Sequence, residues 1–156
     1  MPAIMFVCLG NICRSPAAEA MLRHLAANHS SIKNLKISSC GLGSWHIGQL
    51  PDLRMQETAK RRGVTLSSKA QQLKPEFFEK YDYILAADHE ILNTLYKYAT
   101  TPEQKNKLHL ITAFSSSYNG EDLPDPYYGG EAHFELVLDM IEDACEGLLQ
   151  YIEQHH

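Results

Sequence analysis

The sequence has no long apolar run, and this absence limits where the protein is expected to act. Residues 1–7 lack both the charged start and the apolar length that a secretory signal peptide needs. No stretch approaches the roughly 20 apolar residues that a transmembrane helix requires. We therefore expect a cytoplasmic protein with no membrane partner, and export without a classical signal is compatible with the same sequence.

Basic residues are also few. Lysine and arginine total 14 against 19 aspartate and glutamate residues, which gives a formal net charge of −5. The one tight basic cluster, Lys60-Arg61-Arg62, falls at the predicted end of a helix, where cations interact favourably with the helix dipole. The composition therefore predicts no nucleic-acid partner.

Cysteine is sparse, with four in the chain. In the absence of a signal peptide, this usage is typical of a reducing compartment. Cys8 and Cys13 lie close together, but no second pair of Cys or His at zinc-ligand spacing accompanies them. We expect no metal and no cofactor, and we expect Cys40 and Cys145 to pack in the core.

Predicted strands and helices alternate along the 156 residues, 44% of which are apolar. This length and composition favour one domain over residues 1–156 with one core. Strands are expected at 4–7, 35–39, 81–87 and 108–112, and helices at 17–27, 51–62, from 88 or 89 to about 98, and 134–152. The alternation predicts a three-layer α/β fold with a mostly parallel sheet and a ligand at the carboxyl ends of its strands.

A thiol and a guanidinium flank the first predicted turn from strand to helix. Cys8 ends the apolar run 4–7, Arg14 follows six positions later, and an alanine-rich helix then begins. We expect Ser15 to be the N-cap of that helix, with Pro16 at its first position. The intervening loop, residues 8–14, then forms a cup of backbone N–H groups beside a helix N-terminus, which is an anion site. We call this segment the anion loop.

The chemistry expected in the anion loop is that of an ionised thiol beside a bound phosphate. Such surroundings lower a cysteine pKa from about 8.5 to roughly 3.5–7.5, so Cys8 is expected to be a thiolate. The planar fork of Arg14 can hold two phosphate oxygens at once. Gly10 and Asn11 tolerate the positive φ that turns successive N–H groups inward. A Walker A loop is excluded because the sequence has no Gly-Lys-Ser/Thr.

The stretch Cys8-Leu9-Gly10-Asn11-Ile12-Cys13-Arg14-Ser15-Pro16 resembles the N-terminal signature of the low-molecular-weight protein tyrosine phosphatases. Asp125-Pro126-Tyr127-Tyr128 resembles the general-acid loop of the same family, and the likeness covers essentially the whole chain. It implies a phosphotyrosine phosphatase I-like fold with a four-stranded parallel sheet in the order 2-1-3-4. It also implies hydrolysis of protein phosphotyrosine and small aryl phosphates through a cysteinyl-phosphate intermediate.

The resemblance assigns roles to individual residues. Cys8 is the expected nucleophile, Arg14 the phosphate-holding cation and Asp125 the general acid and base, with Asp122 as a nearby competitor. Phosphate binding and loop support fall to Leu9, Gly10, Asn11, Ile12, Cys13 and Ser15. The substrate cleft is expected to be walled by Trp45, Tyr127 and Tyr128, although a lone tryptophan can equally be core and paired tyrosines can pack inward.

Two positions leave questions open. Many family members carry a histidine that braces the asparagine of the anion loop, and this chain has Ser67 and Ser68 there, so a serine or a water is expected to support Asn11. Cys13 either forms a protective disulfide with Cys8 or packs beneath the loop.

Three other functions compete with this prediction. An arsenate reductase on the same scaffold needs further cysteines, and residues 83–93 contain none. Protein-arginine phosphatases resemble the chain too, but they favour threonine where Ile12 stands. A module that binds phosphate without turnover is the third. The expected partners are phosphotyrosine-containing proteins or peptides, and the protein is expected to be a monomer or a weak dimer.

Overall fold

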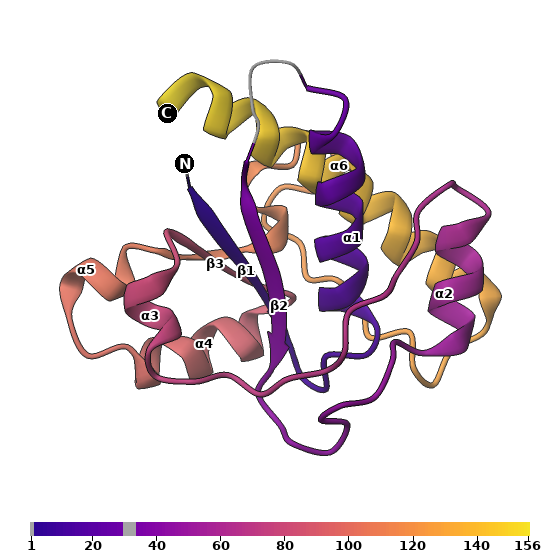
Figure 1. Cartoon of the computed structure of the whole chain (residues 1–156), viewed down its shortest axis with the longest axis horizontal. Helices are drawn as coiled ribbons and strands as arrows, with labels where there is room; N and C mark the ends of the chain where they lie inside the picture. Colours follow the sequence, from indigo (N-terminus) through magenta and orange to yellow (C-terminus); the bar gives the residue numbers. More distant parts are fainter. Residues whose placement is uncertain (1, 30–33) are drawn as a thin grey trace.

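A parallel sheet of four strands in the order β2-β1-β3-β4 runs through the centre of the protein (Figure 1). The computed structural model describes residues 2–29 and 34–156. The strands are β1 (Ala3–Cys8), β2 (Lys36–Gly41), β3 (Tyr83–Ala86) and β4 (Leu108–Leu110). The predicted α/β class and the strand order 2-1-3-4 are both confirmed.

Helices cover both faces of the sheet, so the three-layer prediction is confirmed as well. Figure 1 shows α1, α2 and α6 on one side of the sheet and α3, α4 and α5 on the other. Their bounds are α1 (Arg14–Ala26), α2 (Leu53–Lys60), α3 (Phe77–Lys80), α4 (His89–Tyr98), α5 (Pro102–Lys105) and α6 (Glu131–His155). No helix in the two described ranges is long and apolar enough to cross a membrane.

All six residues of strand β1 are buried, and Ile4, Met5, Phe6 and Val7 are fully inaccessible to solvent. It pairs with β2 on one side and β3 on the other, and helices cover both of its faces. A strand buried on both faces reads as a continuous apolar run rather than an alternation, as residues 4–7 do. The consequence is a rigid strand that ends at Cys8.

Helix α1 begins earlier than the sequence predicts. We expected Ser15 at the N-cap, but the N-cap is Cys13, which makes no capping hydrogen bond through its side chain, and Arg14 is the first helical residue. The Ser15 hydroxyl is instead engaged by Cys8 and Asn11. Pro16 lies in the first turn, where an N–H group has no intrahelical acceptor and its absence costs nothing.

Other boundaries differ by a few residues. Strand β2 continues to Gly41 where a loop was expected from Cys40, because Gly41 pairs with Cys8 in the sheet and with Gln72 in an isolated bridge. The predicted strands 81–87 and 108–112 are shorter in the structure, and the second turns into the 3₁₀ helix η1 (Ile111–Phe114). Helix α5 was not predicted.

The start and end of α2 follow the expected chemistry. Asp52 caps its N-terminus by accepting hydrogen bonds from the backbone N–H groups of Arg54 and Met55. Gly63, which follows directly after the predicted helix 51–62, has a φ of 79°, in the region that favours glycine as a helix stop. Helix α2 is shorter than the predicted 51–62 by two residues at each end.

Helix α6 packs closely against η1 at Gly147. A Cβ atom at this position would lie 1.8 Å from the backbone oxygen of Phe114, which no side-chain rotation relieves. We expect Gly147→Ala to lower the free energy of unfolding by about 1–3 kcal/mol, although alanine alone favours a helix over glycine by about 1 kcal/mol. Urea unfolding would measure this, with the exposed neighbour Glu146→Ala as the control. Equal or greater stability of Gly147→Ala would contradict the packing described.

Candidate active site

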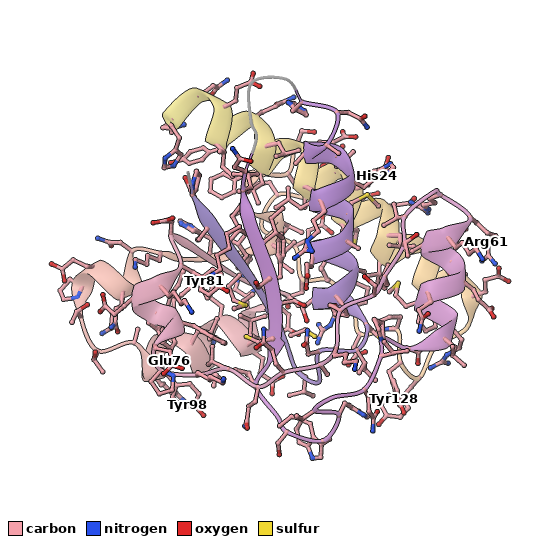
Figure 2. The ribbon with its side chains drawn as sticks, viewed as in Figure 1. His24, Arg61, Glu76, Tyr81, Tyr98 and Tyr128 are labelled. Atoms are coloured by element: carbon pink, nitrogen blue, oxygen red, sulfur yellow. The ribbon has the colours of Figure 1, made fainter. Side chains whose placement is uncertain are left out.

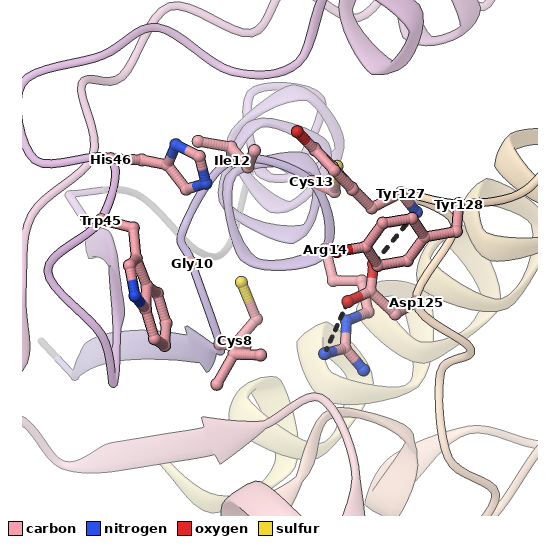
Figure 3. A pocket seen from close by; sticks show the side chains of 11 residues that line it. Cys8, Gly10, Ile12, Cys13, Arg14, Trp45, His46, Asp125, Tyr127 and Tyr128 are labelled. Atoms are coloured by element: carbon pink, nitrogen blue, oxygen red, sulfur yellow. Dashed lines mark hydrogen bonds and ion pairs between the residues drawn. The ribbon is translucent and has the colours of Figure 1, made fainter.

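A cavity of about 420 Å³ opens beyond the carboxyl end of β1 (Figure 3). Three separate segments surround it: the anion loop, the start of the loop after β2, and the segment before α6. The residues that line it are Cys8, Leu9, Gly10, Ile12, Cys13, Arg14, Trp45, His46, Asp125, Tyr127 and Tyr128. Every predicted catalytic and cleft residue is in this set, and Asn11 and Ser15 lie buried behind it.

Cys8 lies at the floor of the cavity with hydrogen-bond partners around its sulfur. The backbone N–H of Asn11 donates to the Sγ atom at 3.2 Å, and the Ser15 Oγ atom lies 2.9 Å from it. Ser15 Oγ accepts a hydrogen bond from the Asn11 amide, and its own proton has two acceptors within reach, the sulfur at 2.9 Å and the backbone oxygen of Cys40 at 3.4 Å. These donors, beside the N-terminus of α1, stabilise negative charge on the sulfur.

Asn11 has a φ of 59°, a left-handed conformation that is uncommon for a residue with a side chain. Its side chain is fixed by three hydrogen bonds. The amide nitrogen donates to Ser15 Oγ at 2.7 Å and to Ser39 Oγ at 3.0 Å, and the amide oxygen accepts from the backbone N–H of Gln71 at 2.9 Å. The support for Asn11 that we sought at Ser67 or Ser68 thus comes from Ser39 and Gln71.

The sequence did not reveal this network. Ser39 also donates to the buried carboxylate of Glu19 at 2.5 Å, and Glu19 pairs with Arg23 at 2.8 Å. A chain of hydrogen bonds therefore runs from Glu19 to Cys8. Its members come from α1, β2 and the anion loop, and the loop near residue 71 joins it at Asn11. No sequence spacing signals that these segments meet.

Arg14 is buried, and hydrogen bonds fix the orientation of its guanidinium. Its Nη1 atom donates to Asp88 Oδ2 at 2.7 Å and to the backbone oxygen of Leu123 at 2.9 Å. Its Nη2 atom lies 3.9 Å from Asp125 Oδ2 at the edge of the cavity. Asp88, predicted only as a possible helix start, caps α4 through its other oxygen and so serves both the helix and the guanidinium.

Asp125 and Asp122 occupy different places. Asp125 lines the cavity with a half-exposed side chain, and its Oδ1 atom accepts a hydrogen bond from the backbone N–H of Tyr127. Asp122 instead accepts from the backbone N–H of His89 at 2.9 Å and lies 2.6 Å from the Nδ1 atom of its ring, outside the cavity. The geometry therefore favours Asp125 over its competitor.

Aromatic side chains flank the cavity on opposite sides (Figure 3). Trp45 is 66% exposed, so the alternative that it is a core residue is wrong. Tyr127 and Tyr128 pack edge to face with ring centroids 5.0 Å apart, and Tyr128 is 93% exposed, so this pair does not pack inward. His46, which we did not predict as a site residue, also lines the cavity; its place beside Trp45 was the available signal.

The other cysteines are buried and free. Burial raises the pKa of the Cys13 thiol well above its usual range, and the neighbouring Asp52 and Cys8 raise it further. Cys40 and Cys145 lie in the core as expected, and burial raises the pKa of both thiols. Among the residues described, no group of three or more His, Cys, Asp or Glu is arranged to hold a metal ion.

The Asn11 network generates a test of stability. Ser39→Ala removes the acceptor of one Asn11 hydrogen bond and a donor to Glu19 in a buried position. Leaving buried polar groups unsatisfied costs about 1–3 kcal/mol, so we expect a decrease of that size in the free energy of unfolding, measured in urea. Ser68→Ala is the matched control, with a change expected within about 0.5 kcal/mol. A larger loss for Ser68→Ala than for Ser39→Ala would contradict the network.

Three comparisons with known proteins agree on the family that this chain resembles. Residues 3–156 match the family model described as low molecular weight phosphotyrosine protein phosphatase. The chain is 39% identical to the low molecular weight protein-tyrosine-phosphatase YfkJ of Bacillus subtilis, over 99% of this chain and 97% of that protein.

Solved structures extend the likeness to the fold. A crystal structure of a protein tyrosine phosphatase from Entamoeba histolytica, with Hepes in its active site, superposes with a TM-score of 0.94 at 37% identity and covers 99% of each chain. The crystal structure of a Drosophila arginine phosphatase superposes with a TM-score of 0.88 at 32% identity, covering 97% of this chain and 98% of that one.

Proposed function

Because the chain belongs to the low molecular weight phosphotyrosine protein phosphatase family, we propose that it hydrolyses phosphotyrosine in proteins, and small aryl phosphates, through a cysteinyl-phosphate intermediate. The observation that carries this proposal is that one cavity holds the Cys8 thiol, the Arg14 guanidinium and the Asp125 carboxyl. These are a nucleophile, an anion-binding group and a proton donor, which together suffice for transfer of a phosphoryl group to the enzyme and then to water.

In the first step the Cys8 sulfur attacks phosphorus and the bond from phosphorus to the phenol oxygen breaks. Asp125 gives its proton to the departing phenolate, while Arg14 and the anion-loop N–H groups hold the three non-bridging oxygens. In the second step Asp125 takes a proton from the attacking water, and the Ser15 hydroxyl donates to the thiolate as the sulfur departs.

The walls of the cavity favour an aromatic leaving group. Trp45 and Tyr127 stand on opposite sides, and Ile12 contributes an apolar surface to the same cavity. A phenyl ring lying between them buries apolar area that an aliphatic phosphate would leave unused. We therefore propose phosphotyrosine-containing proteins or peptides as substrates, with no nucleic-acid or membrane partner and with the protein acting in the cytoplasm as a monomer or weak dimer.

One alternative substrate is supported by a solved structure that resembles this chain. The Drosophila arginine phosphatase shares the fold at 32% identity, so phosphoarginine is the second candidate substrate. Ile12 argues against it, because an isoleucine suits the phenyl ring better than it suits a charged guanidino group. The arsenate reductase alternative is disfavoured because residues 83–93 of this chain contain none of the further cysteines that such an enzyme needs.

The mechanism is tested by two variants. Cys8→Ser is expected to abolish turnover of an aryl phosphate and to retain binding of inorganic phosphate, because the serine hydroxyl is not ionised. Asp125→Ala is expected to lower turnover by roughly 10²–10⁴, the usual contribution of a general acid. Phenol release measures turnover and titration calorimetry measures phosphate binding. Normal turnover by either variant would rule out its assigned role, and binding without any turnover by the unmodified protein would favour the binding module.

The substrate class is tested by comparing matched peptides. We expect kcat/KM to be higher for a phosphotyrosine peptide than for the same peptide carrying phosphoarginine at that position, because Ile12, Trp45 and Tyr127 offer an apolar slot. Release of inorganic phosphate measures both reactions, with Cys8→Ser as the blank. A higher value for phosphoarginine would make the protein an arginine phosphatase.

A further inference from the structure

The segment that carries Asp125 has few attachments to the rest of the protein. In the described parts of the chain, the hydrogen bonds that reach residues 124–129 from outside come from Arg54. Its Nη2 atom donates to the backbone oxygen of Tyr127 at 2.8 Å, and its Nη1 atom donates to that of Gly129 at 3.5 Å. The remaining polar contact is the 3.9 Å approach of Arg14 to Asp125. We call residues 124–129 the acid loop.

Arg54 is itself held at a fixed orientation. Its Nη2 atom lies 3.1 Å from Asp52 Oδ2 and its Nε atom donates to Asp52 Oδ1 at 3.2 Å. Its guanidinium lies over the ring of Tyr127 at 5.6 Å and over the ring of Phe134, in α6, at 4.8 Å. Burial alone would raise the pKa of the Asp52 carboxyl, but the hydrogen bonds from Arg54 outweigh it and lower that pKa, so the pair stays charged.

The same corner of α2 touches the anion loop. The backbone N–H of Asp52 donates to the backbone oxygen of Ile12 at 2.8 Å. Two residues at the start of one helix therefore contact both loops: Asp52 binds the loop that contains the nucleophile, and Arg54 binds the loop that contains the proton donor. The path between the loops is a hydrogen bond, a helix cap and an ion pair, and each of these is directional.

We propose that Arg54, fixed by Asp52, is a positioning residue that holds the acid loop over the anion loop and so places Asp125 for proton transfer. The inference rests on the proposed function, since it needs Asp125 to be the acid. Arg54 acts through the backbone of Tyr127 and touches neither the phosphate nor the leaving group. Its loss lets the acid loop move, and a displacement of about 1 Å in a catalytic group can cost about 10²-fold in rate.

This role predicts a dependence on the leaving group. Phenyl phosphate releases a basic phenolate that needs a proton as the bond breaks, whereas 2,4-dinitrophenyl phosphate releases an anion that is stable without one. We expect Arg54→Ala to lower kcat/KM for phenyl phosphate about 10-fold more than for 2,4-dinitrophenyl phosphate, a part of the 10²–10⁴ that a general acid supplies. A purely structural defect would lower both values equally.

The matched control is Arg61→Ala. Arg61 follows the other end of α2, is 52% exposed against 49% for Arg54, and pairs with Glu131 at 2.6 Å rather than with the acid loop. In Figure 2 it lies well away from Tyr128. We expect Arg61→Ala to leave both kcat/KM values unchanged. Equal losses on the two substrates for Arg54→Ala, or the same behaviour as Arg61→Ala, would overturn the proposal.

Two further variants make the result decisive. Arg54→Lys keeps the positive charge but loses the planar guanidinium, so we expect a smaller loss of kcat/KM that is again greater for phenyl phosphate than for 2,4-dinitrophenyl phosphate. If Arg54→Ala fails to fold, the comparison is made with Arg54→Lys. An equal loss on both substrates for Arg54→Lys would also overturn the proposal. In an Asp125→Ala background, removing Arg54 is expected to cost nothing more on phenyl phosphate, and a full additional loss there contradicts positioning through Asp125.

The outcome for Asp125→Ala alone separates the two hypotheses. If that variant loses no more on phenyl phosphate than on the dinitrophenyl ester, the assignment of the acid in the proposed function is wrong. If it shows the expected selective loss and Arg54→Ala does not, only the positioning role of Arg54 is overturned.

Discussion

The strained backbone of Asn11 is the constraint on which the site depends. A residue with a side chain held at a φ of 59° costs of order 1 kcal/mol or more, and it persists only when its surroundings fix it. Here three side-chain hydrogen bonds from α1, β2 and the loop at residue 71 do so. The same left-handed turn points the backbone N–H of Asn11 at the sulfur of Cys8, so the support of one amide side chain fixes the surroundings of that sulfur.

The two arginines near the site are each oriented by an aspartate that lies outside the cavity. Arg14 is oriented by Asp88, which also caps α4, and Arg54 is oriented by Asp52, which also caps α2. Each aspartate thus ties a guanidinium to the start of a helix. Because Arg14, which lines the cavity, is aligned before any ligand arrives, little ordering of this side chain remains to be done on binding. Such preorganisation is what electrostatic stabilisation of a transition state requires.

The sequence was sufficient to predict the elements and residues whose signals are local. The apolar run before Cys8, the alternation of strands and helices, and the two family motifs gave the fold class, the strand order and every predicted residue that lines the cavity. The predicted N-cap of α1, Ser15, was wrong because the Ser15 hydroxyl contacts the sulfur of Cys8 instead of a backbone N–H of the helix. Ser39 was missed as a support because its role exists only where β2 meets the anion loop.

The same limit applies to residues that act between segments. Asp88 reaches Arg14 across 74 positions of sequence, and Arg54 reaches Tyr127 across 73. No periodic pattern marks such distances. What can be predicted from sequence is therefore the chemistry of the site, and what needs coordinates is the set of residues that holds that chemistry still.

Gly41 shows how closely the sheet and the anion loop are joined. A Cβ atom there would lie 2.9 Å from the backbone oxygen of Leu9 and 3.0 Å from the backbone nitrogen of Asn11, so any other amino acid would have to push the anion loop away from β2. The shape of the anion loop and the residue at the end of β2 therefore constrain each other. A side chain at position 41 is therefore accommodated only if the anion loop and the end of β2 shift relative to each other.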